Sequence, residues 1–286
     1  MTKSTDYSYT DQELQQLHAH LYKITGEVVR VCERLGIGYF IIGGTAIGAY
    51  FWEGMIPWDD DIDIGMTRDD YERFLREAPA VLGDDYFLQW VQTDGHTPAW
   101  FAKVREHHTL FAETMAKDVR MHQGIFVDVF PFDKIPESRR LERLQRHLVN
   151  FFNGCFIGKE IWQWKHFGHC DLPVPRRRGI VPCLVTRLVN TVLSKKGVYK
   201  CLKWSQTLFN NGPSAYCKNV VTANDTVAID HVKHPRKVRF GPLEVAAPRD
   251  LETYLHTHYP VLRKHLPEEE QINHRPSQLV FDTRKS

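Results

Sequence analysis

The chain has 286 residues, of which 42% are apolar and 25% are charged, and its formal net charge is +2. These values are ordinary for a soluble globular protein that can bury a large core. No stretch reaches the roughly 18 apolar residues of a membrane span, and the first residues lack the basic and then apolar pattern of a secretory signal. The six cysteines include no close pair, which argues against a disulfide scaffold. We therefore expect a cytoplasmic protein with reduced thiols.

Charge is distributed unevenly along the chain. Residues 1–137 hold 23 Asp and Glu against 12 Lys and Arg, whereas residues 138–210 hold 3 against 14. A basic middle region indicates an anionic partner. The alternatives are nucleotide phosphates, an anionic membrane surface, an anionic glycan and the acidic first part of the chain itself.

The first predicted element is a helix that ends near Gly36 or Gly38. Thr10 and Glu13 have the spacing of a capping box, and an apolar stripe with spacings of three and four continues from there to Leu35. The stripe indicates packing on a sheet. A coiled-coil dimer is less favoured, because the pattern stops after about three heptads.

An apolar run at residues 39–42 predicts a strand that leads into Gly43 and Gly44. Glycine permits backbone torsions that other residues avoid, and it lets a ligand approach closely. We expect Thr45 to cap a helix from Ala46 to about Trp52, whose first amides would face an anion. The Gly-Gly pair alone is a weak signal, since such pairs often form only a turn.

Residues 56–64, Ile-Pro-Trp-Asp-Asp-Asp-Ile-Asp-Ile, place four carboxylates within five positions. Adjacent like charges repel and are costly to bury, so an ordered structure here needs a cation. On a strand, Asp61 and Asp63 would face one side while Ile62 and Ile64 are buried on the other. Carboxylates bind hard ions such as Mg²⁺, with Mn²⁺ as the alternative. Asp59 is in phase with this pair and would support it.

Two other interpretations of the acidic segment are weaker. It could be a solvated surface loop or a structural calcium loop, but the glycine and distal glutamate of an EF-hand are missing at the required offsets. Gly-Gly followed by Asp61-Ile62-Asp63 is more specific than either signal alone. We therefore favour a metal-dependent active site.

The next segments predict a capped helix at residues 67–75 and a strand at residues 86–91. In residues 100–105, alternation places Phe101, Lys103 and Arg105 on one face. Lys103 and Arg105 could bind phosphates, and Arg105 is favoured because guanidinium pairs with phosphate in a bidentate fork. The alternative is a surface strand with solvated charges.

Residues 125–130 predict an apolar strand with one acid, Asp128. A carboxylate inside a sheet needs compensation for its buried charge. Asp128 is thus a candidate metal ligand, or the base that takes a proton from an acceptor hydroxyl. The alternative is a strand-end acid in water. Asp133 follows Pro131 and is expected in a turn or cap.

The basic middle region is predicted to be mostly helical. Residues 139–152 have a helical pattern, residues 171–179 are typical of a loop, and residues 181–193 form an amphipathic pattern between basic flanks. Such a helix can lie on an anionic bilayer, although covering a core is the commoner role. A zinc site is a weaker alternative, since the chain has no Cys-x-x-Cys pair. Its candidate ligands are His166, His169, Cys170 and Cys183.

The C-terminal part predicts a two-stranded hairpin within residues 228–245 and a helix that begins at residues 248–255. His274 could approach the acidic segment. We prefer a packed or exposed histidine, because a lone histidine carries little information.

The order strand, Gly-Gly, helix and Asp-apolar-Asp strand is typical of the nucleotidyltransferase fold. The blocks at residues 44–49 and 56–63 resemble those of the LicD/fukutin-type phosphotransferases. The resemblance continues at residues 103–105 and 124–133, and near the C-terminus. Many family members carry arginine where this chain has Phe51, which makes the identity of the donor less secure than the metal site.

The fold expected is α+β, a nucleotidyltransferase-like mixed sheet with flanking helices plus a mostly helical basic insertion. We expect a catalytic core at residues 8–136 and a helical basic region at 137–215 that faces the acceptor or a membrane. Residues 216–280 would form a C-terminal hairpin and helix that pack on the core.

The resemblance also implies the reaction. It implies transfer of a phospho-alcohol, such as phosphocholine or ribitol phosphate, from a CDP-linked donor to a glycan acceptor, with release of CMP. The acceptor would be a cell-surface glycan, such as lipopolysaccharide or teichoic acid, in free or lipid-linked form, and the enzyme could contact the inner face of the membrane. The expected metal ligands are Asp61, Asp63 and Asp128 with Asp59 in support, and the expected nucleotide- and phosphate-binding residues are Gly43, Gly44, Thr45, Lys103 and Arg105.

Three other functions stay open. A conventional nucleotidyltransferase would use the same residues to move a nucleoside monophosphate onto a small acceptor. A non-catalytic nucleotide-binding scaffold is less favoured because all three key acids are present. A nucleic-acid partner is not expected, because the acidic first part of the chain opposes it.

Overall fold

The computed structural model of the protein describes residues 9–161, 186, 188–221, 225–259, 261–271 and 273–285. Several predicted features between residues 162 and 187 lie outside the described residues. They are the loop at 171–179, much of the amphipathic helix at 181–193, and the alternative zinc ligands His166, His169, Cys170 and Cys183.

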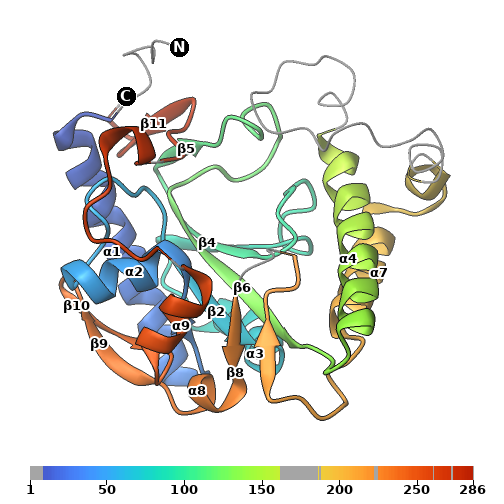
Figure 1. Ribbon diagram of the computed structural model, residues 1–286. Coiled ribbons are helices and arrows are strands. Elements are labelled where there is room, and N and C mark those ends of the chain that lie inside the picture. Colours follow the sequence, from blue (N-terminus) through green and yellow to red (C-terminus); the bar gives the residue numbers. More distant parts are fainter. Residues whose placement is uncertain are drawn as a thin grey trace.

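A mixed sheet of seven strands forms the centre of the described chain (Figure 1). Five of them lie in the order β1 (Phe40–Ile41), β2 (Asp63–Thr67), β6 (Phe126–Lys134), β4 (Ala102–Glu106) and β3 (Tyr86–Gln89). β2 and β6 are parallel, and the other neighbours in this row are antiparallel. β7 (Tyr216–Lys218) pairs with the end of β6, and β8 (Thr226–Ala228) pairs with β7.

Two smaller two-stranded sheets complete the strands of the described chain. The predicted hairpin is confirmed as β9 (Arg236–Phe240) and β10 (Leu243–Ala247). β5 (Leu110–Ala112) pairs with β11 (Gln278–Val280), so the C-terminal part of the chain returns to the first half (Figure 1).

The long N-terminal helix is confirmed as α1 (Asp11–Leu35). Thr10 and Glu13 form the predicted capping box, and Gly36 ends the helix with a φ of 60°, which favours glycine. The apolar stripe faces the core, where Leu17, Leu21, Ile24, Val28 and Val31 are fully buried and Leu14 and Leu35 at its ends are partly buried. α1 contacts β4, β6 and β10, which makes the stripe a packing surface of the sheet.

Shorter helices surround the row of strands. α2 (Gly43–Trp52) contacts β2, and α3 (Arg68–Glu77) contacts β2 and β6. Thr67 caps α3, and a 3₁₀ turn at Ala78–Ala80 follows it. In the C-terminal part, α8 (Ile229–Lys233) precedes the hairpin, α9 (Leu251–His258) packs on α2, and a 3₁₀ turn spans Glu268–Glu270.

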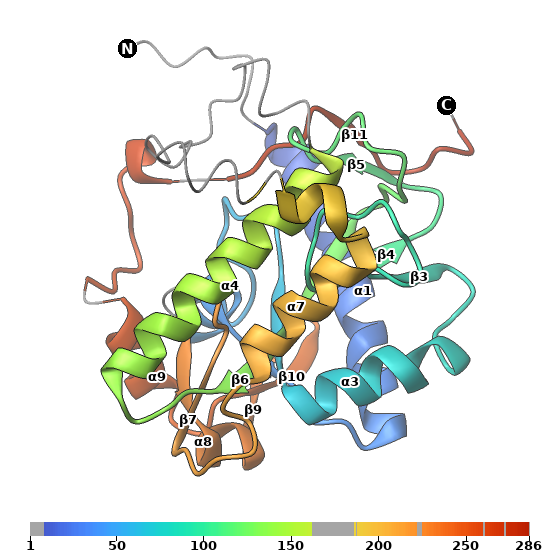
Figure 2. The same ribbon diagram turned by 90° about the vertical axis from the view of Figure 1, so that its right-hand side faces the viewer.

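The basic middle region contributes two long helices, α4 (Arg139–Glu160) and α7 (Lys195–Thr207). They pack side by side on the opposite side of the molecule from α1 (Figures 1 and 2). Phe156 of α4 and Leu202 of α7 are fully buried in the same apolar core as the sheet. No helix among the described residues is both long and apolar enough to cross a membrane. The predicted α+β class, with a mixed sheet and flanking helices, is confirmed.

One prediction near the end of β6 is wrong. Asp133 lies not in a turn but within β6, which continues through Pro131 to Lys134. Its carboxylate is 1% exposed and accepts two hydrogen bonds from Arg68, from Nε at 2.8 Å and from Nη2 at 2.6 Å. Asn210 donates a third at 2.7 Å. The guanidinium of Arg68 compensates the buried charge, so the strand tolerates an acid there.

Candidate active site

The acidic segment and the lone acid of β6 meet at the centre of the sheet. Asp63 is the first residue of β2, and its register partner across the parallel ladder is Asp128 of β6. Ile62 and Ile64 are buried on the other side, as the alternation predicts. Lys103 of β4 is the register partner of Asp128 on its other flank. Residues from three segments of the sequence thus form one row across three strands.

Gly43 and Gly44 leave space for the carboxylates. A Cβ atom on Gly44 would lie 2.6 Å from Oδ2 of Asp59, and one on Gly43 would lie 3.2 Å from Oδ2 of Asp63. Gly43 also has a φ of 57°. Any larger residue at Gly44 would displace the carboxylate of Asp59. The two glycines therefore provide the space that the acidic side chains occupy.

Thr45 does not cap the helix, because α2 already begins at Gly43 and Ile42 stands at its N-cap without a side-chain bond. Instead the Thr45 hydroxyl accepts a hydrogen bond from the backbone amide of Asp63 at 2.8 Å. Tyr254 of α9 joins this region, since its hydroxyl accepts from the Gly43 amide at 3.2 Å and donates to Asp225 at 3.1 Å. Thr45 therefore fixes the start of β2 relative to α2.

Burial and mutual repulsion disfavour the charged forms of the acids. Burial, followed by the charges of Asp61 and Asp60, raises the pKa of Asp59 to about 8. The pKa of Asp63 lies well above its usual range, first because it is buried and second because Asp61 and Asp128 are near. Burial likewise raises the pKa of Asp61, and it raises that of Asp128 to about 6 although Lys103 opposes the shift.

The positive charge on this part of the sheet lies at Lys103 and Arg105. Nζ of Lys103 is 2.9 Å from Oδ1 of Asp128 and 3.3 Å from Oε1 of Glu113. Arg105 is fully buried and donates to Gln89 at 2.5 Å, to the Gly124 carbonyl at 2.7 Å and to Glu113 at 3.2 Å. Both side chains are buried and paired, but only Lys103 contacts Asp128, so the geometry favours Lys103 over Arg105 as a phosphate ligand, the reverse of the sequence-based preference.

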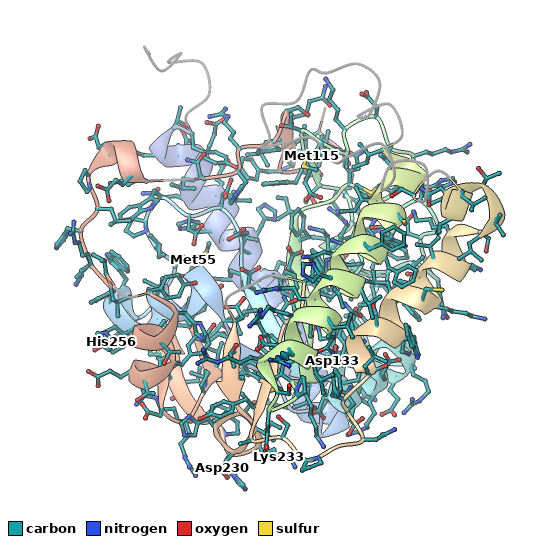
Figure 3. The ribbon with its side chains drawn as sticks, turned by 45° about the vertical axis from the view of Figure 1, so that its right-hand side comes forward. Met55, Met115, Asp133, Asp230, Lys233 and His256 are labelled. Atoms are coloured by element: carbon teal, nitrogen blue, oxygen red, sulfur yellow. The ribbon has the colours of Figure 1, made fainter. Side chains whose placement is uncertain are left out.

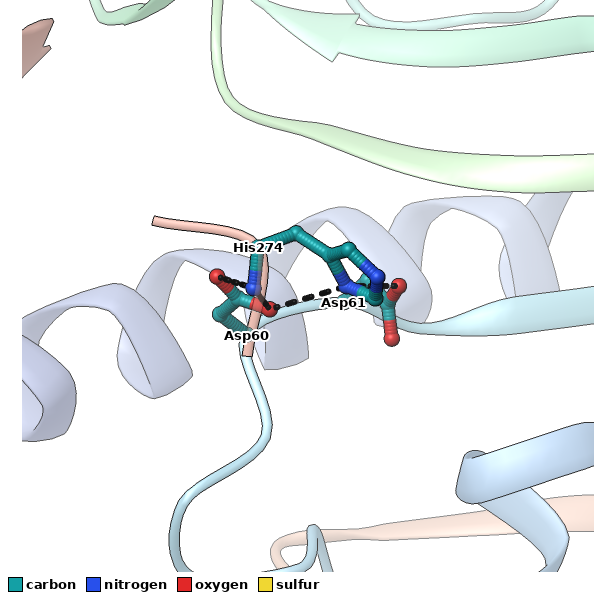
Figure 4. Close-up of side chains that lie close together, drawn as sticks. All are labelled: Asp60, Asp61 and His274. Carbon is teal, nitrogen blue, oxygen red and sulfur yellow. Dashed lines mark hydrogen bonds and ion pairs between the residues drawn. The ribbon is translucent and has the colours of Figure 1, made fainter. Parts of the chain in front are cut away.

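His274 lies beside the acidic segment, which the sequence left as the less favoured possibility, and its side chain is exposed, as the preferred one had it. Its Nδ1 is 3.7 Å from Oδ1 of Asp60 and 3.8 Å from Oδ2 of Asp61 (Figure 4). Interaction with Asp60, followed by the charges of Asp61 and Asp60, raises the pKa of His274 to about 9. Asp60 itself is buried and accepts hydrogen bonds from Tyr9 and from the His274 backbone.

Some of these residues carried no usable sequence signal. Glu113, Asp225 and Tyr254 reach the site through loops and a helix whose positions follow only from tertiary packing. The sequence showed Asp60 as one of four clustered acids. Only the structure shows that its partners, Tyr9 and the His274 backbone, differ from those of Asp59, Asp61 and Asp63.

The donor set fits a divalent metal ion. Asp59, Asp61, Asp63 and Asp128 influence one another electrostatically and have raised pKa values, so a cation would favour their ionised forms. Carboxylate oxygens are the ligands that Mg²⁺ and Mn²⁺ prefer. Oxygen atoms of Asp60 and Asp61 and a ring nitrogen of His274 also lie within 4.8 Å of one another.

Comparison with known families now identifies the domain. The family model described as LicD/FKTN/FKRP, nucleotidyltransferase domain, matches residues 36–177. The chain belongs to the LicD family. The matched segment contains Gly43, Gly44, the acidic segment, Lys103 and Asp128, whereas His274 lies outside it.

The similar proteins match only part of the chain. The lipopolysaccharide cholinephosphotransferase LicD of Haemophilus influenzae is 31% identical over 130 residues, which are 44% of this chain and 48% of that protein. An uncharacterized protein of Rickettsia typhi is 36% identical over 59 residues, 21% of this chain and 19% of its own length. One of Rickettsia prowazekii is 38% identical over 50 residues, 18% of this chain and 19% of its length. The chain thus matches about half of the Haemophilus protein and about a fifth of the others.

Proposed function

We propose that this chain transfers a phospho-alcohol from a CDP-linked donor to a cell-surface glycan and releases CMP. The observation that carries the proposal is the register pairing of Asp63 with Asp128 inside a LicD-family domain. The name of the Haemophilus relative, a lipopolysaccharide cholinephosphotransferase, supports phosphocholine as the group transferred and lipopolysaccharide as the acceptor.

Mg²⁺, with Mn²⁺ as the alternative, would be held by Asp61, Asp63 and Asp128, with Asp59 in support. When bound, the metal neutralises the negative charge of the donor's phosphates and of the departing CMP. The raised pKa values of these acids support this assignment, because burial and mutual repulsion disfavour the ionised carboxylates and a bound cation would offset both.

The chain's own residues would bind the phosphates and handle the proton. Lys103 lies next to Asp128 and would attract a phosphate oxygen. The amides of Gly44 and Thr45, at the N-terminus of α2, have no acceptor among the described residues and would bind a phosphate oxygen. Asp128, with its pKa of about 6, is suited to take the proton of the acceptor hydroxyl near neutral pH.

A lipid-linked acceptor would bring the enzyme to the inner face of the membrane. Leu144 of α4 and Trp204 of α7 are each 55% exposed, and both helices carry exposed basic residues such as Arg143 and Lys200. Apolar and basic side chains on the same helices support peripheral contact with anionic lipid. Binding to vesicles of phosphatidylcholine with and without phosphatidylglycerol tests this: sedimentation with the anionic vesicles alone is expected.

A conventional nucleotidyltransferase is the second candidate, because it would use the same acids. The deciding experiment incubates the protein with Mg²⁺, a glycan extract and CDP-choline, CDP-ribitol, CDP-glycerol or CDP-ethanolamine, and follows CMP. We expect CMP from one donor, lost with EDTA and in Asp61→Asn by more than about 100-fold, whereas the exposed Asp84→Asn keeps wild-type rates. A parallel incubation replaces the CDP-linked donors by nucleoside triphosphates. Release of pyrophosphate there, with no CMP from any CDP-linked donor, would instead establish the second candidate.

A further inference from the structure

The C-terminal strap, residues 273–280, connects the two ends of the candidate site. At one end the His274 amide donates to both carboxylate oxygens of Asp60, at 3.0 and 2.9 Å. At the other end β11 pairs with β5, and the amide and hydroxyl of Ser277 both donate to the Ala112 carbonyl at 2.9 Å. Glu113, the partner of Lys103, directly follows β5. The strap is therefore held at Asp60 at one end and at Ala112, next to Glu113, at the other.

Asp60 joins the strap to the N-terminus of α1. Its carboxylate also accepts a hydrogen bond from the Tyr9 hydroxyl at 2.8 Å, and its side chain is fully buried. Arg275 pairs with Glu13 at 3.1 Å and lies over the Tyr9 ring at 5.0 Å. Because donors of the protein already occupy both oxygens of Asp60, it is better suited to hold the strap than to hold a metal.

The strap carries the His274 ring to Asp61. The side chain is 74% exposed, and Nδ1 lies 3.8 Å from Oδ2 of Asp61 (Figure 4). Lys103 lies at the other end of the candidate site, where its ammonium pairs with Asp128. An imidazole N–H this close to Asp61 can reach an anionic oxygen of a ligand that a metal ion would hold beside the same carboxylate.

We propose that His274 contacts the diphosphate of the donor and that Asp60 is a positioning residue that holds His274 in place. This inference rests on the proposed function and deepens it. It assigns different roles to neighbouring acids, with Asp59, Asp61 and Asp63 toward the ligand and Asp60 toward the strap.

The test measures binding of CDP by calorimetry with saturating Mg²⁺, and binding of Mn²⁺ alone by electron paramagnetic resonance. His274→Ala is expected to weaken CDP binding roughly tenfold, the effect of one hydrogen bond to a charged group, with Mn²⁺ binding and the melting temperature unchanged. His274→Gln retains a donor and should recover part of the loss. His256→Ala, an exposed histidine on α9 (Figure 3), is the control and should bind CDP as the wild type does.

A double-mutant cycle tests the role of Asp60. Asp60→Asn should weaken CDP binding on its own but add nothing in the His274→Ala background, because it acts through His274. If Asp60→Asn does not fold, Tyr9→Phe takes its place in the cycle. It removes one hydrogen-bond donor to Asp60 and should likewise weaken CDP binding only when His274 is present. Asp230→Asn, an exposed acid at the lower edge of Figure 3, is the matched control.

The outcomes separate the two proposals. Unchanged CDP binding in His274→Ala would overturn the contact, and additive losses in the double variant would overturn the role of Asp60. A wild-type protein that binds Mn²⁺ but not CDP would overturn the CDP-linked donor itself, and the inference with it.

Discussion

Asp63 on β2 and Asp128 on β6 are direct neighbours across a parallel ladder, with Lys103 on the far flank of Asp128. Two acids at one register position are unfavourable without a cation, since like charges directly opposite each other destabilise a sheet. Without a cation this arrangement lowers stability, which is the physical basis of the metal site that we propose.

Asp63→Asn should separate stability from activity. Without metal, the variant should be more stable than the wild type by about 1 kcal/mol, because one of the repelling charges is gone. Mg²⁺ should raise the melting temperature of the wild type but not of the variant. Thermal unfolding with EDTA and with Mg²⁺ measures both effects. A variant that is less stable without metal would contradict the repulsion.

Gly44→Ala should impair the metal site although residue 44 does not contact the metal ion. The new Cβ would lie 2.6 Å from Oδ2 of Asp59, so the carboxylate must move. We expect Mn²⁺ binding to weaken about tenfold, as for other changes that disturb the orientation of a ligand. Gly95→Ala is the control, because a Cβ there would meet no atom within 4 Å. Equal Mn²⁺ affinities in the two variants would remove Asp59 from the metal site.

Asp133→Asn should destabilise the fold strongly, because the buried guanidinium of Arg68 loses the carboxylate that pairs with its Nε and Nη2 and keeps only the half-buried Glu72 at 3.2 Å. Breaking a buried ion pair on one side costs about 3–5 kcal/mol. Arg68→Met with Asp133→Leu should regain most of this loss. Urea unfolding measures the three free energies, with Asp230→Asn at the exposed pair with Arg249 as the control, expected within about 0.5 kcal/mol of wild type.

His122 should make stability depend on pH. Its Nδ1 accepts from the Gly124 amide at 3.1 Å, so the neutral ring is required there. Burial, followed by the charges of Arg105 and His107, lowers its pKa to about 4. A histidine with a lowered folded-state pKa binds fewer protons when folded, so its contribution is full above about pH 6.5 and is lost as the pH falls toward 4.

The comparison with His122→Asn isolates this contribution, because other groups also titrate in acid. Asparagine retains an acceptor for Gly124, so the loss of stability between pH 7 and 4.5 should be about 1 kcal/mol smaller than in the wild type. His256→Asn, at an exposed site, should follow the wild-type curve. Identical pH curves for His122→Asn and wild type would contradict the lowered pKa.

Local patterns accounted for most of the secondary structure. The capping box at Thr10, the apolar stripe of α1 and the cap of α3 at Thr67 formed as predicted, because each depends on residues within one or two turns. The predictions for Thr45 and Asp133 were wrong for the same reason. Their side chains bond to partners distant in sequence, Asp63 and Arg68, and local propensity contains no information about such partners.

The sequence by itself determined the acids of the candidate site. The alternation of residue types predicted that Asp61 and Asp63 lie on the opposite side from the buried Ile62 and Ile64. Asp128 was identified as a lone acid in an apolar strand, because a buried carboxylate needs a compensating partner. Only the tertiary structure decided which residues surround them. Strand register brought Lys103 to Asp128, burial confined Arg105 to the interior, and the return of the C-terminal strap brought His274 to Asp61. These contacts depend on how distant segments pack, which no local pattern records.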